Sequence, residues 1–319
     1  MRKTYFFITI LIFIIILAII TSPQRYISAF SLGLETWAKI LLPTLFPLIF
    51  FTKLLTDLDI LSVLSSKITF TKKLFNAPPI SAYAFMVSIL SGYPVGAKVV
   101  SDLYSSGHIT KNDAIKMCTF TSNSGPMFIY GSVGISMLCS RTLGLIMLFS
   151  HIFSAILNGV LYRNYKVSNQ IPNSYKLETK PKFSLASSMT DSILSILLIG
   201  GFVSVFFVVI ELLDQIQIFE FIASIFSGLF GVDQNFLVGI FNGIVEMTHG
   251  CLDISTLNIP LDVIAVICTG IITFGGIATM LQAFAFLQKI GISFKFFILQ
   301  KITQTIFACV ICSLLVILF

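Results

Sequence analysis

The chain has 319 residues, of which 56% are hydrophobic and 11% are charged, with a formal net charge of +6. Soluble proteins carry about 25% charged residues, so this composition excludes a soluble domain and indicates a polytopic membrane protein. A membrane-spanning helix needs about 20 residues, which leaves room for roughly eight such elements and for no soluble catalytic domain.

The N-terminus carries an apolar run, residues 5–21, behind Arg2 and Lys3. The run is longer than the hydrophobic region of most signal peptides, and no small-x-small cleavage site follows it before Pro23. We therefore predict a transmembrane helix near residues 5–22, with a cytoplasmic N-terminus and an external loop that extends to residue 30.

Lysine and arginine are unevenly distributed along the rest of the chain. The stretch 183–288 contains neither, although it holds several acidic residues. Because basic loops mark the cytoplasmic side of a membrane protein, most loops of this stretch are expected to face outward. The segments expected to be cytoplasmic are 53–73, 98–116, 163–182 and 289–301.

These constraints predict two halves with opposite orientation. Residues 78–98 are expected to re-enter the membrane from the cytoplasm and residues 216–250 from outside. The remaining helices are predicted near 37–56, 113–138 and 142–162 in the first half, and near 191–213, 262–286 and 296–319 in the second. The first half (31–162) and the second (191–319) are then inverted-topology repeats of one membrane domain, joined by a cytoplasmic linker (163–190).

Polar, glycine-rich segments interrupt apolar stretches at residues 91–98 and 242–250. The lipid core cannot satisfy free backbone N–H and C=O groups, so a helix broken at membrane depth must line a cavity enclosed by protein. Ser91-Gly92 precedes Ser124-Gly125 by the same separation as Asn242-Gly243 precedes Gly275-Gly276. This match supports an internal duplication.

Several motifs together resemble a known family. They are residues 42–47 (LPTLFP), 90–98 (LSGYPVGAK), 107–109 (GHI), 123–129 (NSGPMFI), 246–250 (EMTHG) and 274–276 (FGG). With these motifs the chain resembles the sporulation integral membrane proteins of the YlbJ family, which are grouped with the nucleoside-recognition or Gate-domain membrane proteins.

The resemblance implies an all-α polytopic fold in which two inverted-topology repeats carry re-entrant or broken helices, related to the concentrative nucleoside transporters. It also implies a role in moving dipicolinate during endospore formation. The expected location is the bacterial cytoplasmic membrane, with the mother-cell or outer forespore membrane as its place during sporulation.

The first break suits an anionic substrate, because its glycines and proline free backbone N–H groups where a half-helix presents its positive end. The candidate substrate-binding residues are Ser91, Gly92, Tyr93, Pro94, Gly96 and Lys98. In the alternative interpretation the glycines allow close helix packing and Lys98 extends to the membrane surface.

One later interruption, and the helix that corresponds to it in the second half, supply further substrate-binding candidates. Asn123, Ser124 and Gly125 precede Pro126, which removes a backbone donor from the helix. Gly275, Gly276 and Gln282 lie at the corresponding place in the second half. Alternatively, the polar residues bridge helices and the glycines form a packing notch.

Glu246 is the most informative single residue, since a carboxylate near the bilayer centre costs about 2.5 to 3.5 kcal/mol. It is a candidate for binding a coupling ion together with Thr248, for carrying a proton, or for contacting substrate beside Asn242. Alternatively, it lies near the external surface or forms a structural hydrogen bond. His249 is interpreted as an interfacial or packing residue.

The sequence contains no phosphate-binding loop, zincin helix or nucleophile elbow, and its six cysteines lack partners at metal-ligand spacing. We expect no enzyme activity, cofactor, metal or nucleic-acid partner. The predicted function is a secondary transporter or permease for a small organic anion, with dipicolinate favoured and with proton or sodium as the coupling ion. The alternatives are a non-transporting Gate-domain scaffold in a sporulation membrane complex and a transporter of nucleoside-like solutes. Besides the lipid bilayer, a second copy of the chain and other sporulation membrane proteins stay open as partners.

Overall fold

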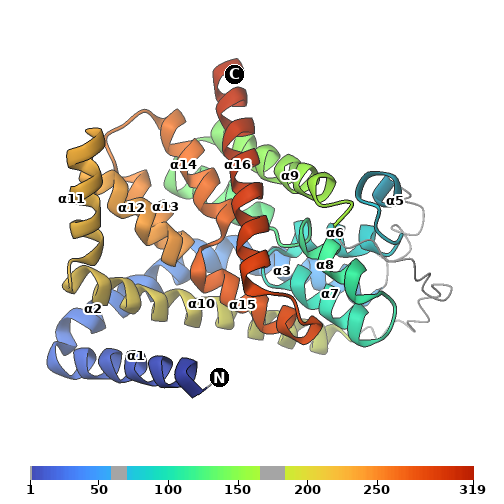
Figure 1. The fold of residues 1–319 in the computed structure, drawn as a ribbon, viewed down its shortest axis with the longest axis horizontal. Helices are drawn as coiled ribbons and strands as arrows, with labels where there is room; N and C mark the ends of the chain where they lie inside the picture. The colour runs from blue at the N-terminus through green and yellow to red at the C-terminus, as the bar shows by residue number, and fades with distance from the viewer. Residues whose placement is uncertain (1, 59–69, 166–183) are drawn as a thin grey trace.

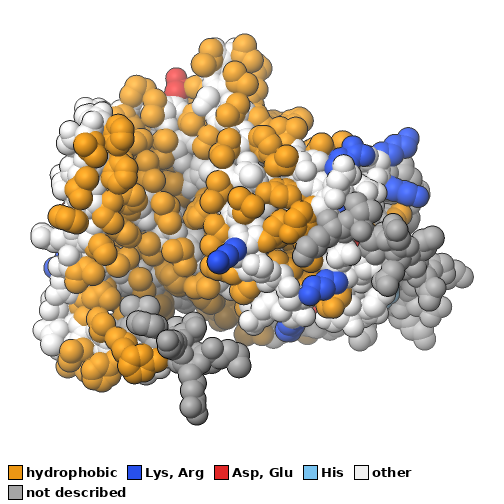
Figure 2. Space-filling view, in the orientation of Figure 1, with side chains coloured by type: hydrophobic (Ala, Val, Ile, Leu, Met, Phe, Trp, Pro, Cys, Tyr) orange, Lys and Arg blue, Asp and Glu red, His pale blue; other side chains and the backbone are white. Residues whose placement is uncertain are grey.

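The computed structural model describes residues 2–58, 70–165 and 184–319, and all regular elements in these ranges are helical (Figure 1). Five of the described helical stretches are long and apolar enough to cross a membrane: Pro23–Leu55, Arg141–Leu161, Leu185–Gln215, Leu261–Ile290 and Phe294–Leu318. Hydrophobic side chains cover much of the face in Figure 2, while most Lys and Arg gather at the end where α5, α7 and α8 lie. Such an apolar surface is typical of a membrane-embedded protein, and the predicted polytopic class is confirmed.

The N-terminal region is more helical than predicted. Helix α1 (Arg2–Thr21) agrees with the first predicted helix, but α2 (Pro23–Thr36) replaces the external loop expected up to residue 30. Pro23 stands at the first position of α2, where its missing N–H would be unpaired in any helix, so it starts the helix instead of breaking it. Helix α2 continues through the π-helical turn η1 (Trp37–Leu41) into α3 (Leu42–Asp57).

The rest of the first half contains two interrupted elements. After the short α5 (Phe70–Phe75), α6 (Ser81–Ser91) and α7 (Val95–Ser105) meet at a break where Gly92 has a φ of +72°. The helix expected near 113–138, with an interruption before Pro126, is α8 (Lys111–Cys118), a non-helical segment and the π-helix η2 (Met127–Met137). The long helix α9 (Arg141–Leu161) follows as predicted.

The second half has a similar order of elements. It begins with the long α10 (Leu185–Gln215), so the C-terminal end of the expected linker is helical, whereas residues 166–183 of that linker lie outside the described ranges. Helices α11 (Ile218–Phe230), α12 (Gln234–Val245) and α13 (Met247–Ser255) follow. The helix expected near 262–286 is divided at Gly275 into α14 (Leu261–Phe274) and α15 (Gly276–Leu287), because Gly275 and Gly276 both have positive φ. A 3₁₀ turn, η3 (Gln288–Ile290), then leads to α16 (Phe294–Leu318).

The glycine pairs that match in the sequence make corresponding contacts. A Cβ on Gly92 would come 3.0 Å from Gly125 Cα, so the two backbones touch in the first half. A Cβ on Gly276 would come 3.1 Å from Gly243 O and 3.1 Å from Met247 N in the second half. In each half, therefore, the break of the hairpin packs on the break of the following interrupted helix.

Two lysines at the ends of segments expected to be cytoplasmic, Lys116 and Lys301, are buried in helices. Lys116 lies in α8, 3.6 Å from Asp113 Oδ1, and donates to Asn76 O at 2.5 Å. Lys301 lies in α16 and is 0% exposed. Acceptors from distant parts of the chain surround both lysines, which counting basic residues by segment does not reveal.

Candidate functional site

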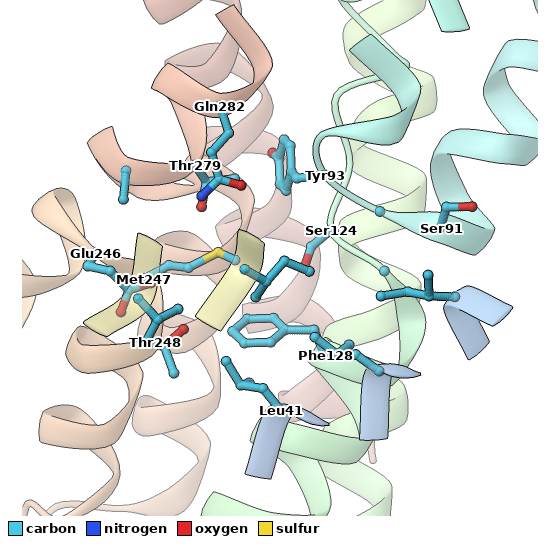
Figure 3. Close-up of a pocket in the computed structure, with 17 residues that line it drawn as sticks. Leu41, Ser91, Tyr93, Ser124, Phe128, Glu246, Met247, Thr248, Thr279 and Gln282 are labelled. Carbon is cyan, nitrogen blue, oxygen red and sulfur yellow. The ribbon is translucent and has the colours of Figure 1, made fainter. Parts of the chain in front are cut away.

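A cavity lies where the breaks of the two halves meet, with about 590 Å³ of empty space including its open mouth (Figure 3). One wall is apolar and comes from the long helices and η2; it is formed by Leu41, Leu45, Ile49, Phe128, Ile199 and Val203. The other walls carry polar side chains: Ser91, Tyr93, Ser124, Glu246, Thr248, Thr279 and Gln282. A mostly apolar cavity with a few convergent polar groups is typical of a small-molecule site.

Four helical segments begin at this cavity. Gly92 and Tyr93 precede Pro94, the N-cap of α7, and Ser124 and Gly125 precede Pro126, the N-cap of η2. The first residues of α13 and the first turn of α15 also line it. Because the first N–H groups of a helix lack intrahelical partners and carry a positive partial charge, this convergence favours an anion, and at α13 the Glu246 carboxylate itself takes that place.

Glu246 forms one side of the cavity, opposite Tyr93 and Ser124 (Figure 3). Its residue is 2% exposed, and it separates α12 from α13 as the N-cap of α13. Its Oε2 accepts a hydrogen bond from His249 N at 2.8 Å. The described residues place no Lys or Arg nitrogen within 4.0 Å of its carboxylate. Glu246 is therefore both a structural cap, stabilised by the helix end, and a carboxylate at the cavity.

Lys301 of α16 lies behind the wall opposite Glu246, where it contacts Tyr93. Its Nζ donates to Tyr93 Oη, to Ser122 O at 2.9 Å and to Gln304 Oε1 at 2.9 Å. It also lies 5.1 Å from the centroid of the Tyr93 ring. The sequence interpretation missed Lys301 by counting it only as a basic residue that marks the cytoplasmic side. The available signal was a lysine well inside an apolar stretch long enough to span a membrane, which is a site hypothesis by default.

A second buried network holds the first-half break in place. His151 Nε2 accepts from Ser124 N at 3.0 Å, so its Nδ1 carries the hydrogen and donates to Thr273 Oγ1 at 2.9 Å. Asn123 donates to Ser88 Oγ at 3.0 Å and accepts from Gln304 Nε2 at 3.2 Å. These bonds tie the non-helical segment before η2 to α6, α9, α14 and α16. His151 was not identified from the sequence, since nothing local distinguishes it from a packing residue.

About half of the predicted substrate-binding residues line the cavity. Those at its walls are Ser91, Gly92, Tyr93, Ser124, Gly125, Glu246, Thr248 and Gln282. Those outside the lining are Pro94, Gly96, Lys98, Asn123, Asn242, Gly275 and Gly276. The sequence did not identify the apolar wall or the contributions of Met247 and Ala278, because the inward face of an apolar helix depends on tertiary packing.

Several of the predicted residues that do not line the cavity make packing contacts or hydrogen bonds elsewhere. Gly96 packs against the Thr121 carbonyl, and the side chain of Lys98 is exposed. The two glycines at the start of α15 form the break itself. Asn242 Nδ2 donates to Asp253 Oδ2 at 2.8 Å, and the same oxygen lies 3.0 Å from His249 Nδ1. The His249 ring packs edge-on against Phe207, 4.4 Å between centroids, so it contributes to packing at the second break.

Comparison with known proteins agrees with the family resemblance. The chain is 25% identical over 322 residues to the sporulation integral membrane protein YlbJ of Bacillus subtilis (strain 168), a match that spans 93% of this chain and 79% of the relative. No protein-family model and no solved structure matches the chain. The resemblance to YlbJ carried by the motifs is confirmed.

Proposed function

From the similarity to a sporulation integral membrane protein and the geometry of the cavity, we propose that this chain is a secondary transporter or permease for a small organic anion, and that it moves dipicolinate during sporulation. The observation that carries the proposal is the convergence of four helix N-termini on one cavity. Broken helices that present their positive ends to an anionic substrate are a recurring arrangement in transporters.

The proposed architecture is a pair of inverted-topology repeats of the Gate type. Each half contains a long helix, a broken hairpin, an interrupted helix and a final long helix. The paired contacts of Gly92 with Gly125 and of Gly276 with Gly243 support a common origin of the halves. Alternating access then follows from movement of one half against the other around the cavity. We place the N-terminus in the cytoplasm, and the protein in the cytoplasmic or outer forespore membrane.

Dipicolinate fits the chemistry of the walls. It is a flat aromatic ring with two carboxylates, so helix N-termini and hydroxyls suit its oxygens, while Tyr93 and Phe128 offer aromatic contact to its ring. Glu246 opposes this anion unless its own charge is neutralised. A proton or sodium ion at Glu246, with Thr248 beside it, therefore accompanies the anion and couples its movement to an ion gradient.

The proposal is tested by dipicolinate uptake into proteoliposomes loaded with terbium, whose luminescence reports dipicolinate that has entered. Uptake is measured under imposed proton and sodium gradients for the wild type and for Glu246→Gln, which keeps an oxygen to cap α13 but cannot ionise. Glu35→Gln is the matched control, because Glu35 is exposed and pairs with Lys39 on the surface.

Saturable uptake that one gradient drives, that Glu246→Gln abolishes and that the control retains supports a coupled anion transporter. If folded wild-type protein takes up no dipicolinate under either gradient, the proposed substrate is wrong. Folded protein that also fails with nucleosides and other organic anions favours the scaffold function.

A further inference from the structure

Lys301 is a buried cation without an anionic partner. It lies within α16, a helix long and apolar enough to span a membrane, and is 0% exposed. Among the described residues, no carboxylate oxygen lies within 4.0 Å of its Nζ. An isolated charge in such a place is costly unless it is hydrogen-bonded, neutralised or matched by a ligand. The groups around Lys301 therefore have to stabilise the protonation state that it adopts.

The three partners of Lys301 satisfy both of its protonation states. In the ammonium form, three N–H groups donate to Tyr93 Oη, Ser122 O and Gln304 Oε1, while the Tyr93 hydroxyl turns toward Thr273 O, 3.5 Å away. In the amine form, two N–H groups keep Ser122 O and Gln304 Oε1, and the nitrogen lone pair accepts the Tyr93 hydroxyl hydrogen. Two carbonyl-type acceptors plus one hydroxyl allow this exchange, because only a hydroxyl both donates and accepts.

Tyr93 connects this amine with the cavity. Lys301 does not line the cavity, whereas Tyr93 does. A proton passes from the ammonium to Tyr93 Oη as the original hydroxyl hydrogen turns from Thr273 O into the cavity and leaves to a water molecule there. One N–H bond breaks, one O–H bond forms and another breaks, and one proton reaches the water, so Tyr93 ends neutral. The reverse sequence charges Lys301 from the cavity.

The other titratable groups near Lys301 are either already hydrogen-bonded or lie on other turns of the helices around it. His151 on α9 is the titratable side chain nearest in the network, and its Nε2 accepts from Ser124 N, so it is neutral and already bonded on both nitrogens. Arg141 of α9 and Asp262 and Cys268 of α14 lie on other turns of the helices that pack against α16. On α16 itself, Lys295 is exposed, and Cys309 and Cys312 lie further along the helix. Glu246 faces the cavity from its opposite side.

We propose that Lys301 and Tyr93 form a proton-binding site, in which Lys301 is an ammonium when an anion occupies the cavity and an amine when the cavity is empty. Its role in transport rests on the proposed function. The charged lysine supplies, through the polarised Tyr93 hydroxyl, the positive side of a site whose other side is Glu246. Protonation and anion binding then favour each other, and the anion enters together with a proton.

The direct test is a titration of the wild-type protein in lipid nanodiscs, with lysine side chains labelled with ¹⁵N and tyrosine rings with ¹³C, from about pH 5 to about pH 9. Lys301→Met identifies the Lys301 signal, and Lys295→Met, an exposed lysine on the same helix, is the matched control. We expect the Lys301 nitrogen of ligand-free protein to change from ammonium to amine, with a concerted change at the Tyr93 ring. A nitrogen that keeps one form throughout overturns the proposal.

Added dipicolinate is expected to hold Lys301 in the ammonium form at a pH where the empty protein has the amine. A Lys301 signal that does not change when dipicolinate binds overturns the link between the charge of Lys301 and anion binding. If Lys301 and Tyr93 titrate together but wild-type protein neither binds nor carries dipicolinate, the proposed function fails in its substrate while the proton site stands.

Two variants separate proton binding from mere packing. Lys301→Arg keeps a cation that does not release its proton, so we expect dipicolinate binding within about threefold of wild type but a loss of proton-driven accumulation of about tenfold or more. Tyr93→Phe keeps the ring and removes the relay, and is expected to slow proton-driven uptake by about tenfold. Tyr104→Phe on α7 is its control. Unchanged proton-driven accumulation in folded Lys301→Arg contradicts the assignment.

Discussion

The breaks of the two halves are built alike but carry opposite chemistry. In both, the backbone of the hairpin break contacts the next interruption along the chain, through Gly92 and Gly125 in one half and Gly243 and Gly276 in the other. The first break presents a hydroxyl backed by the buried Lys301, whereas the second presents the carboxylate of Glu246. A common backbone plan thus places groups of opposite charge on opposite sides of one cavity. The glycines determine the shape of both breaks, whereas the side chains that each half contributes determine the sign of the charge on its side of the cavity.

The largest effect is expected from filling the close contact in the second half. In Gly250→Ala, the new Cβ would collide with the backbone of Gly243, where no flexible side chain can give way. We expect a loss of stability of about 2 to 4 kcal/mol, measured as thermal unfolding in detergent. Gly201→Ala on α10 is the control, since its Cβ meets nothing within 4 Å. Equal melting temperatures for the two variants would show that the breaks are not closely packed.

The next largest effect is expected on the negatively charged side of the cavity, at Glu246. Glu246→Gln is expected to reduce gradient-driven dipicolinate uptake by at least about tenfold while leaving the protein folded, because the amide oxygen still accepts from His249 N. Counterflow exchange of dipicolinate without a gradient is expected to persist. A folded variant with normal gradient-driven uptake would show that Glu246 is a cap and nothing more.

A smaller effect is expected behind the first break. His151→Ala removes the acceptor of Ser124 N and the donor to Thr273, so we expect a loss of stability of about 1 to 3 kcal/mol together with weaker dipicolinate binding. His151→Gln offers an amide that replaces one of the two bonds and is expected to recover part of both losses. Full stability in the alanine variant would remove the positioning role of His151.

The smallest effect separates the two lysines associated with the first break. The side chain of Lys98 is exposed on α7, so Lys98→Ala is expected to change the rate of dipicolinate uptake by less than about twofold. Lys301→Met, by contrast, removes the buried cation and is expected to abolish proton-driven uptake. A strong loss of dipicolinate uptake in Lys98→Ala would show that Lys98 binds the substrate anion, as the sequence predicted.

The breaks were predictable because their cause is local. Glycine, proline and polar residues inside apolar stretches exclude a continuous helix, which indicated the interruptions near Gly92, Pro126 and Glu246. Eight of the predicted site residues consequently line the cavity. The extension of the second helix back to Pro23 was missed, since the residues up to 30 were expected to form an external loop.

The partners behind the walls were not predictable, because their cause is tertiary. Lys301 meets Tyr93 and Ser122, which come from distant parts of the chain, and the sequence counted it only as a mark of the cytoplasmic side. His151 likewise joins two segments that no spacing relates. Which apolar side chains face the cavity depends on helix rotation, as the inclusion of Leu41 and Ile199 illustrates.

An electron cryo-microscopy map of the wild-type protein at saturating dipicolinate tests most directly whether the cavity is the anion site. We expect density for the anion in the cavity, with its ring beside Tyr93 and Phe128 and its carboxylates at the starts of η2 and α15. Dipicolinate bound elsewhere in a protein that transports it, with this cavity empty, would show that the cavity is not the substrate site.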